Sequence, residues 1–128
     1  MPHVTVEYTD NIENEANIGA FLKKINESLI SEGDTFTPGA IRSRAIKLTE
    51  YFVADGTGED DAFVHVTMKI APGRTAEVKK AACDHLFEMM QAHFNELFEN
   101  RYLALSLELF EFGEGGTYKQ NNIHKRYK

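Results

Sequence analysis

Residues 62–70 read AFVHVTMKI, and this stretch decides the fold. Every second side chain from Val64 to Ile70 is apolar, while Phe63, His65, Thr67 and Lys69 occupy the positions between them. A period of two with β-branched residues is typical of a β-strand that has one face in the core and one face outward. We therefore expect a strand over 62–70 whose two faces differ in chemistry.

The chain after this strand continues with a turn, a helix and a second strand. Pro72-Gly73 turns the chain, and helical spacing predicts a helix from about Thr75 to Phe98. Residues 103–112 alternate again and predict a strand. Glycines at 113, 115 and 116 then lead into the polar tail YKQNNIHKRYK. The apolar stripe expected along the helix consists of Val78, Ala82, Leu86, Met89, His93 and Leu97.

The chain before residue 62 follows the same plan. Residues 3–8 alternate as a strand, residues 18–29 carry apolar side chains at helical spacing, and Gly33 supplies a stop. A loop over 34–40 precedes a strand predicted from about Ile41 to Val53, which ends at the turn Asp55-Gly56-Thr57-Gly58. The sequence thus predicts two β-α-β units, over about 2–55 and 61–112, followed by the tail 113–128.

These two units define the expected architecture. A helix that crosses between two strands of one unit makes those strands parallel. We predict an α+β fold in which residues 1–128 form a single domain, with one four-stranded sheet and both helices on one face. The other face carries Val, Phe, Thr and His rather than charges alone, and a core of this size is small, so we expect subunits to pack there.

Composition narrows the classes of function. The 128 residues carry a net charge of −6, which argues against a nucleic-acid binder. Cys83 is the only cysteine, no signal peptide precedes the first strand, and no apolar run approaches the roughly 20 residues that cross a bilayer. We expect a cytoplasmic protein with neither a nucleic acid nor a membrane as its partner. An anionic substrate would need cations gathered locally.

The pair Met1-Pro2 stands directly ahead of the first strand. A small second residue favours removal of the initiator methionine, which would leave Pro2 with a free secondary amine. An α-amino group titrates near about 8, and burial or neighbouring guanidinium groups favour its uncharged form. Its ring also holds the nitrogen rigidly. Pro2 is therefore a candidate general base, although many chains begin in this way without catalytic meaning.

Four segments spread over the whole chain carry a resemblance to known proteins: PHVTVEYTDNI at 2–12, GAIRSRAI at 39–46, DGTGEDDAFVHVTMKIAPGRT at 55–75 and YKQNNIHKRYK at 118–128. With them the chain resembles the tautomerase superfamily and, within it, the 5-carboxymethyl-2-hydroxymuconate Δ-isomerase family. The resemblance implies a homotrimeric enzyme of homoprotocatechuate (4-hydroxyphenylacetate) catabolism. Such an enzyme converts a dienol polycarboxylate into its conjugated keto isomer without a metal or an organic cofactor.

The same resemblance implies the roles of three residues. Pro2 is the catalytic proton carrier, and Arg42 and Arg74 bind the carboxylates of the substrate. The loop before Arg42 is about one residue longer than the family pattern, so Arg44 is the alternative to Arg42. The residue types suit the chemistry, because one base of near-neutral pKa can take a proton from the 2-hydroxyl and return it to carbon. Arginine binds carboxylates bidentately and stays charged.

Other interpretations remain open or are set aside. The chain could run another proline-based reaction of the superfamily, such as tautomerisation of a phenylenolpyruvate or hydration of a halogenated acrylate. It could instead be a non-catalytic module that binds small ligands, if Met1 is retained and the Pro2 nitrogen stays an amide. A metal site is not expected, because His85 and His93 lie two helical turns apart without an accompanying carboxylate pair or cysteine.

Overall fold

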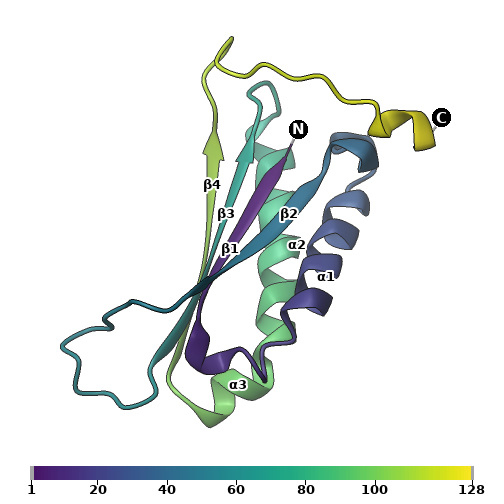
Figure 1. Ribbon diagram of the computed structural model, residues 1–128. Helices are drawn as coiled ribbons and strands as arrows, with labels where there is room; N and C mark the ends of the chain where they lie inside the picture. Colours follow the sequence, from purple (N-terminus) through teal and green to yellow (C-terminus); the bar gives the residue numbers. More distant parts are fainter. Residues whose placement is uncertain (1, 128) are drawn as a thin grey trace.

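Four strands form one mixed sheet in the computed structural model, which describes residues 2–127 (Figure 1). The strand order is β2-β1-β3-β4. Strand β1 (His3–Thr9) is parallel to β2 (Arg42–Leu48), β3 (Ala62–Ile70) is parallel to β4 (Leu103–Glu111), and β1 is antiparallel to β3. The crossover helices are α1 (Ile18–Ile30) and α2 (Ala76–His93), and both lie on the same face of the sheet. The predicted duplication and layer arrangement are confirmed.

The core lies between the sheet and the two helices. Along β3, Val64, Val66, Met68 and Ile70 are at most 1% exposed, which confirms the face predicted from their alternation. Phe21, Ile25 and Leu29 of α1 are fully buried against this layer, because they recur at the spacing of helical turns. The opposite face of the sheet carries no helix, and its residues include Thr5, Thr67, His65 and Ser106.

The second strand is shorter than the sequence predicts. It was expected to reach Val53, but β2 ends at Leu48, and residues 49–61 form a loop. The strand ends because its only neighbour in the sheet, β1, ends. Leu48 pairs with Thr9, the last residue of β1, and after Thr9 the chain forms a 3₁₀ helix, η1 (Asp10–Ile12). An edge strand cannot continue its ladder beyond the end of its partner.

The long helix predicted from Thr75 to Phe98 is divided in two. Helix α2 ends at His93, and α3 (Asn95–Asn100) follows a break at Phe94, whose φ of −99° and ψ of 11° are not helical. Phe94 is 1% exposed and packs edge-to-face on Phe21, with ring centroids 4.8 Å apart. The buried residues along this segment are Ala82, Leu86, Met90 and Phe94. The expected stripe is therefore right at Ala82 and Leu86, but Met90 and Phe94 are buried in place of Met89 and His93.

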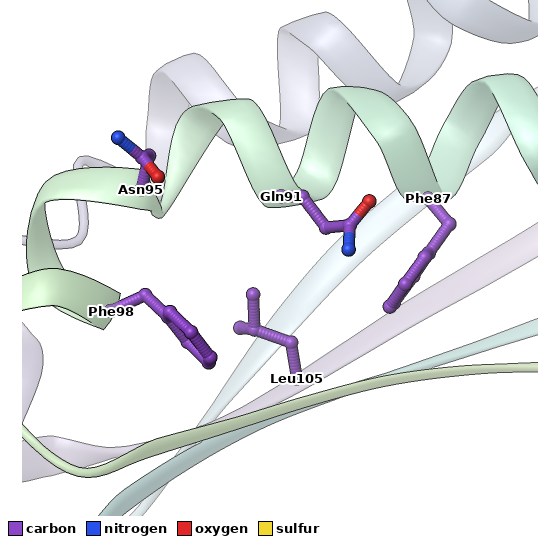
Figure 2. A pocket seen from close by; sticks show the side chains of 5 residues that line it. All are labelled: Phe87, Gln91, Asn95, Phe98 and Leu105. Carbon is purple, nitrogen blue, oxygen red and sulfur yellow. The ribbon is translucent and has the colours of Figure 1, made fainter.

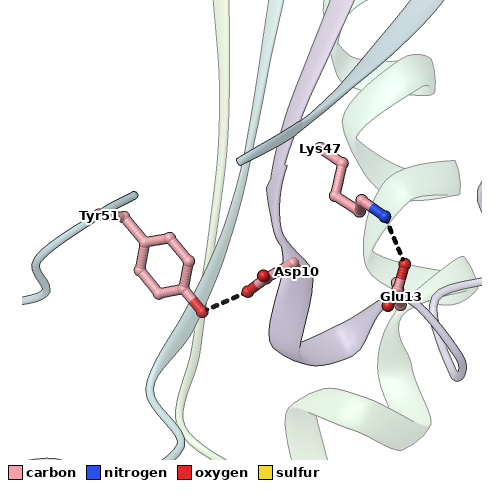
Figure 3. Close-up of polar contacts among 4 residues, drawn as sticks. All are labelled: Asp10, Glu13, Lys47 and Tyr51. Atoms are coloured by element: carbon pink, nitrogen blue, oxygen red, sulfur yellow. Dashed lines mark hydrogen bonds and ion pairs between the residues drawn. The ribbon is translucent and has the colours of Figure 1, made fainter. Parts of the chain in front are cut away.

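Polar contacts fix the end of the sheet where α3 lies. The Tyr51 hydroxyl donates to Asp10 Oδ1 at 2.8 Å, and Lys47 Nζ pairs with Glu13 Oε2 at 2.8 Å (Figure 3). The first contact holds the β2–β3 loop against η1, and the second joins the end of β2 to Glu13, the residue after η1. Among residues 2–127, no helix has the length and hydropathy of a membrane span.

Candidate active site

Pro2 lies at the other end of the sheet, where four chain segments meet. Because β3 and β4 run opposite to β1 and β2, the starts of the first two strands and the ends of the last two share this end. The backbone N–H of Arg42 donates to the Pro2 carbonyl oxygen at 3.1 Å, and Pro2 itself is buried. This single bond places the arginine-bearing strand beside the proposed base.

The side chain of Arg42 is held close to that position. Arg42 pairs with His3 across the two strands, so both side chains point to the helix-free face. Its Nη1 donates to the Ala40 carbonyl oxygen at 3.3 Å. Ala40 ends the 3₁₀ helix η3 (Pro38–Ala40), whose N-terminal proline has a φ suited to that turn. Arg42 therefore stands about 3 Å along the strand from Pro2, one residue rise.

Arg44 sits deeper on the same face. It pairs with Thr5, about 10 Å along the sheet from Pro2. Its Nη1 lies 3.2 Å from His3 Nδ1. Burial lowers the pKa of His3, and the charges of Arg44 and Arg42 lower it further, so the imidazole is neutral at pH 7 and its Nδ1 can accept from Arg44. This contact engages Arg44 with the histidine and favours Arg42 as the arginine nearer the base.

Arg74 precedes α2 and is fixed by three neighbours. Its Nη1 donates to the Ala71 carbonyl at 3.1 Å, its Nη2 donates to the Thr35 carbonyl at 3.0 Å, and its guanidinium lies over the Phe36 ring at 4.7 Å. Gly73 turns the chain here with a φ of +118°, a conformation that glycine adopts without strain. The planar group is thus pre-oriented, with further N–H donors left for a ligand.

Arg74 lines an open hollow of about 680 Å³ at this end of the molecule. The start of α2 also faces it through Thr75, whose side chain caps the helix by accepting from the Val78 N–H at 3.2 Å. Lys119, from the C-terminal tail, forms part of the same wall. The remaining lining residues are Asp34, Thr35, Ala71, Pro72, Gly73 and Val78.

Basic and acidic side chains both lie at this end of the sheet, since Asp34 lines the hollow together with Arg74 and Lys119. Within residues 2–127, none of Arg42, Arg74 and Lys119 belongs to a salt bridge, whereas Lys47, Lys79 and Lys80 each pair with a carboxylate. Arg42, Arg74 and Lys119 are therefore candidate contacts for an anionic ligand, although Arg42 and Pro2 do not line the hollow that holds the other two.

The other chemical groups singled out by the sequence lie elsewhere. His85 and Glu32 pair at 2.8 Å on the surface, and His93 bonds the Ala16 carbonyl at 2.8 Å inside the helix layer. Cys83 is half-buried, and burial raises the pKa of its thiol, so it is a poor nucleophile. Across the part of the chain that the structure describes, no three His, Cys, Asp or Glu side chains gather as a metal site.

A second hollow, of about 360 Å³, lies between α2 and β4 near α3 (Figure 2). Its lining consists of Phe87, Gln91, Asn95, Phe98 and Leu105. Leu105 belongs to the start of β4, at the end of the sheet away from Pro2. None of these side chains carries a charge, so the hollow has no group suited to a carboxylate.

The fold is a duplicated β-α-β sheet with both helices on one face, and known isomerases share it. The family model described as "5-carboxymethyl-2-hydroxymuconate isomerase" matches residues 2–127, and the chain belongs to that family. It is 41% identical over 128 residues to the 5-carboxymethyl-2-hydroxymuconate Delta-isomerase of Escherichia coli, with 100% of both chains covered. The resemblance stated from the sequence is confirmed.

Two solved structures show how far the likeness extends. A 5-carboxymethyl-2-hydroxymuconate isomerase from Deinococcus radiodurans R1 is 48% identical, with a TM-score of 0.95 over 99% of this chain and 94% of that one. A fused 4-OT symmetric trimer is 18% identical, with a TM-score of 0.67 over 92% and 93% of the two chains. At 18% identity, this second comparison shows only that the two proteins share a fold.

The position of the tail is the feature that sequence reasoning missed. The sequence predicts only a polar tail for YKQNNIHKRYK, yet Asn121 Nδ2 donates to the Gly39 carbonyl at 2.8 Å, and Lys119 lines the hollow with Arg74. No periodicity marks this segment, because it forms only one short 3₁₀ helix, η4 (Ile123–Tyr127). Its density of lysine and asparagine was the only available signal.

Proposed function

We propose that the chain isomerises 5-carboxymethyl-2-hydroxymuconate to its conjugated keto form, with the amine of Pro2 as proton carrier. The proposal rests chiefly on the hydrogen bond from the Arg42 N–H to the Pro2 carbonyl, which joins a base and a carboxylate-binding cation at one end of the sheet. Membership of the isomerase family supports the reaction class. The pathway would be the catabolism of homoprotocatechuate.

The proposed reaction is a proton transfer along a dienol. The Pro2 nitrogen takes the proton of the 2-hydroxyl and returns it to a carbon of the same conjugated system, so no atom is gained or lost. Negative charge builds on the conjugated oxygens and carboxylates during transfer. Arg42 and Arg74 stabilise this charge, because both guanidinium groups are already oriented by backbone carbonyls and need little rearrangement.

Burial and cationic neighbours would keep the mature Pro2 amine ready for this task. Both favour the uncharged amine over the ammonium form. Removal of Met1, a residue outside the described part of the chain, is the step that frees the nitrogen. A chain that keeps the methionine has an amide there, without a basic lone pair, and would be inactive.

The helix-free face supports a homotrimer. Ile46 and Phe110 are 47% and 54% exposed on this face, which also carries the hydroxyl group of Thr67. His65 Nδ1 lies 2.6 Å from Ser106 Oγ, so these two polar groups of the face already satisfy each other. A related fold is known as a symmetric trimer, and three copies that pack these faces together would bury the apolar part.

The test is a rate measurement on chain whose N-terminus has been verified by intact mass. We expect the chain that begins at Pro2 to isomerise the dienol, and a chain with one extra residue ahead of Pro2 to lose the activity. Phenylenolpyruvate serves as the competing substrate. Comparable kcat/KM values on the two substrates would contradict the specific assignment, and normal turnover by the extended chain would contradict the mechanism.

A further inference from the structure

We infer that the C-terminal tail forms a wall of the substrate site, with Lys119 binding the third carboxylate of a tricarboxylate substrate. The inference rests on the proposed function for the identity of the substrate. Muconate carries two carboxylates, and the carboxymethyl arm adds a third. Arg42 and Arg74 account for two anionic groups, so the chemistry of the substrate calls for one further cation.

The tail is placed to supply that cation. It leaves the end of β4, passes over the end of the sheet where the N-terminus lies, and finishes beside η3 (Figure 1). Lys119 lines the same hollow as Arg74 and Thr75. Within residues 2–127 its ammonium forms no salt bridge, so its charge is available to an incoming anion.

Two contacts hold the tail in this position. Asn121 Nδ2 donates to the Gly39 carbonyl oxygen at 2.8 Å. His124 packs so closely on Gly39 that a Cβ there would lie 2.8 Å from His124 Nδ1 and 3.0 Å from its Cα. A glycine is therefore required where tail and η3 meet. Since the Ala40 carbonyl next to Gly39 binds Arg42, the same contact connects the tail with the arginine beside Pro2.

The flexibility of lysine suits the task. Its ammonium is a point charge on a long stem, which can follow a flexible carboxymethyl arm more easily than a rigid guanidinium fork. The ammonium would act on binding rather than on proton transfer, because Pro2, the proposed proton carrier, does not line the hollow that holds Lys119. Its removal should change KM much more than kcat.

The first experiment compares K119Q with K125Q on verified mature enzyme. Lys125 belongs to the same tail but does not line the hollow, so it controls for general loss of tail charge. We expect K119Q to raise KM for 5-carboxymethyl-2-hydroxymuconate about tenfold, with kcat changed less than about twofold, and K125Q to leave both near wild type. Equal effects of the two substitutions, or no effect of K119Q, would overturn the inference.

A shorter substrate makes the assignment specific. On 2-hydroxymuconate, which lacks the carboxymethyl arm, K119Q should change KM less than about twofold, since two carboxylates then face two arginines. The same rise in the KM of K119Q on both substrates would show that Lys119 does not bind the third carboxylate. K119R should recover most of the affinity for the longer substrate, because it restores the charge.

Asn121 is expected to be a positioning residue for Lys119. N121A should raise KM for the longer substrate. The KM of the double variant N121A/K119Q should be no higher than that of K119Q alone, because no Lys119 ammonium is then present for a loosened tail to displace. Independent, additive effects would contradict this role for Asn121.

Titration with a saturated, unreactive tricarboxylate separates the inference from the proposed function. Wild-type binding that weakens about tenfold in K119Q would support the tail site even if the dienol were not turned over. Turnover of the dienol combined with equal binding by wild type and K119Q would leave the isomerase function standing and overturn the role of Lys119.

Discussion

The backbone N–H of Arg42 donates to the Pro2 carbonyl oxygen at 3.1 Å, which places the start of β2 beside Pro2. The two arginines on β2 then differ by their place in the register. Arg42 pairs with His3, next to Pro2, whereas Arg44 pairs with Thr5 and contacts the neutral imidazole of His3 at 3.2 Å. A difference of two residues along the strand thus separates Arg42, which we propose as a substrate-binding residue, from Arg44, which contacts His3.

This difference predicts unequal effects of neutral substitutions. R42Q should raise KM for the dienol by about 10- to 100-fold, the range expected when a charged hydrogen bond to a carboxylate is lost. R44Q should change KM less than about threefold, since the residue lies about 10 Å from Pro2 along the sheet. Steady-state kinetics on both variants provide the test. A larger effect of R44Q than of R42Q would reverse the assignment.

The arginines could be named from sequence through the family resemblance, but their distinction could not. Ile41-Arg42-Ser43-Arg44 alternates in a way that places both arginines on one face of a strand, whatever the register. Which of them lies beside Pro2 depends on where β2 begins against β1, and the turn at Pro38–Ala40 decides that. The position of Lys119 could not be predicted for a similar reason, since it depends on the contact of Asn121 with Gly39, 82 residues away in sequence.

The secondary-structure elements show where local pattern and tertiary packing agree. Strands β1, β3 and β4 were predicted to within about two residues, because alternation reports directly on a half-buried strand. The end of β2 was wrong because it depends on the end of β1. The helix break at Phe94 was wrong because periodicity alone does not reveal that this ring turns into the core beside Phe21.

The break makes Phe94 a stability determinant. F94A should reduce the free energy of unfolding by about 3–5 kcal/mol, as expected for a fully buried phenylalanine that leaves a cavity. F98A provides a matched control, because Phe98 lies one turn further on and is 58% exposed, and surface substitutions usually change stability by less than about 0.5 kcal/mol. Chemical denaturation of both variants tests this. Similar losses in the two would mean that Phe94 does not anchor the junction of α2 and α3.

We also expect the stability of the folded state to depend on pH through His93, which lies at the junction of α2 and α3. Burial lowers the pKa of His93 below 6.5, although its bond to the Ala16 carbonyl acts in the opposite direction. Lys24 Nζ lies 3.1 Å from Nδ1, and Glu15 and Glu96 line the adjacent hollow. The unfolded chain binds the proton first as the pH falls, so the folded state loses stability as pH falls through 6.5.

The H93Q variant isolates that effect. We expect the free energy of unfolding of the wild type to decrease between pH 7 and about pH 5, and the decrease to be smaller in H93Q. His3 contributes with the same sign, since its pKa is also lowered by burial. His85 contributes with the opposite sign, because its hydrogen bond to Glu32 raises the pKa, so H85Q provides the control. A steeper decrease in H93Q than in the wild type would contradict the account.

Charged side chains are distributed unevenly between the two ends of the sheet. Arg42, Arg74 and Lys119 lie around the Pro2 end, whereas acidic residues gather in the β2–β3 loop and η1 at the other end. An anionic substrate would therefore be drawn to one end of a protein that repels it on average. The helix-free face between the two ends is the surface that we expect to be covered by other copies of the chain.

Assembly is tested by mass and by one charged substitution. Light scattering should give three times the 14.5 kDa of the chain for the wild type. T67R places a long cation at the centre of the helix-free face and should lower the mass, because an unpaired charge would be buried between subunits. E88R, on the exposed side of α2, should leave the mass unchanged. A monomeric wild type, or a trimeric T67R, would contradict packing through this face.

Labelling of the mature chain with an unsaturated carboxylate electrophile tests the role of Pro2 most directly. Only an uncharged secondary amine at the cationic end combines nucleophilicity with attraction for the anionic reagent, since Cys83 is half-buried with a raised pKa. We predict a single adduct on Pro2, mapped by peptide mass, with activity lost in proportion and both slowed by a tricarboxylate ligand. Inactivation with the adduct on another residue, or full activity after complete modification of Pro2, would contradict the account.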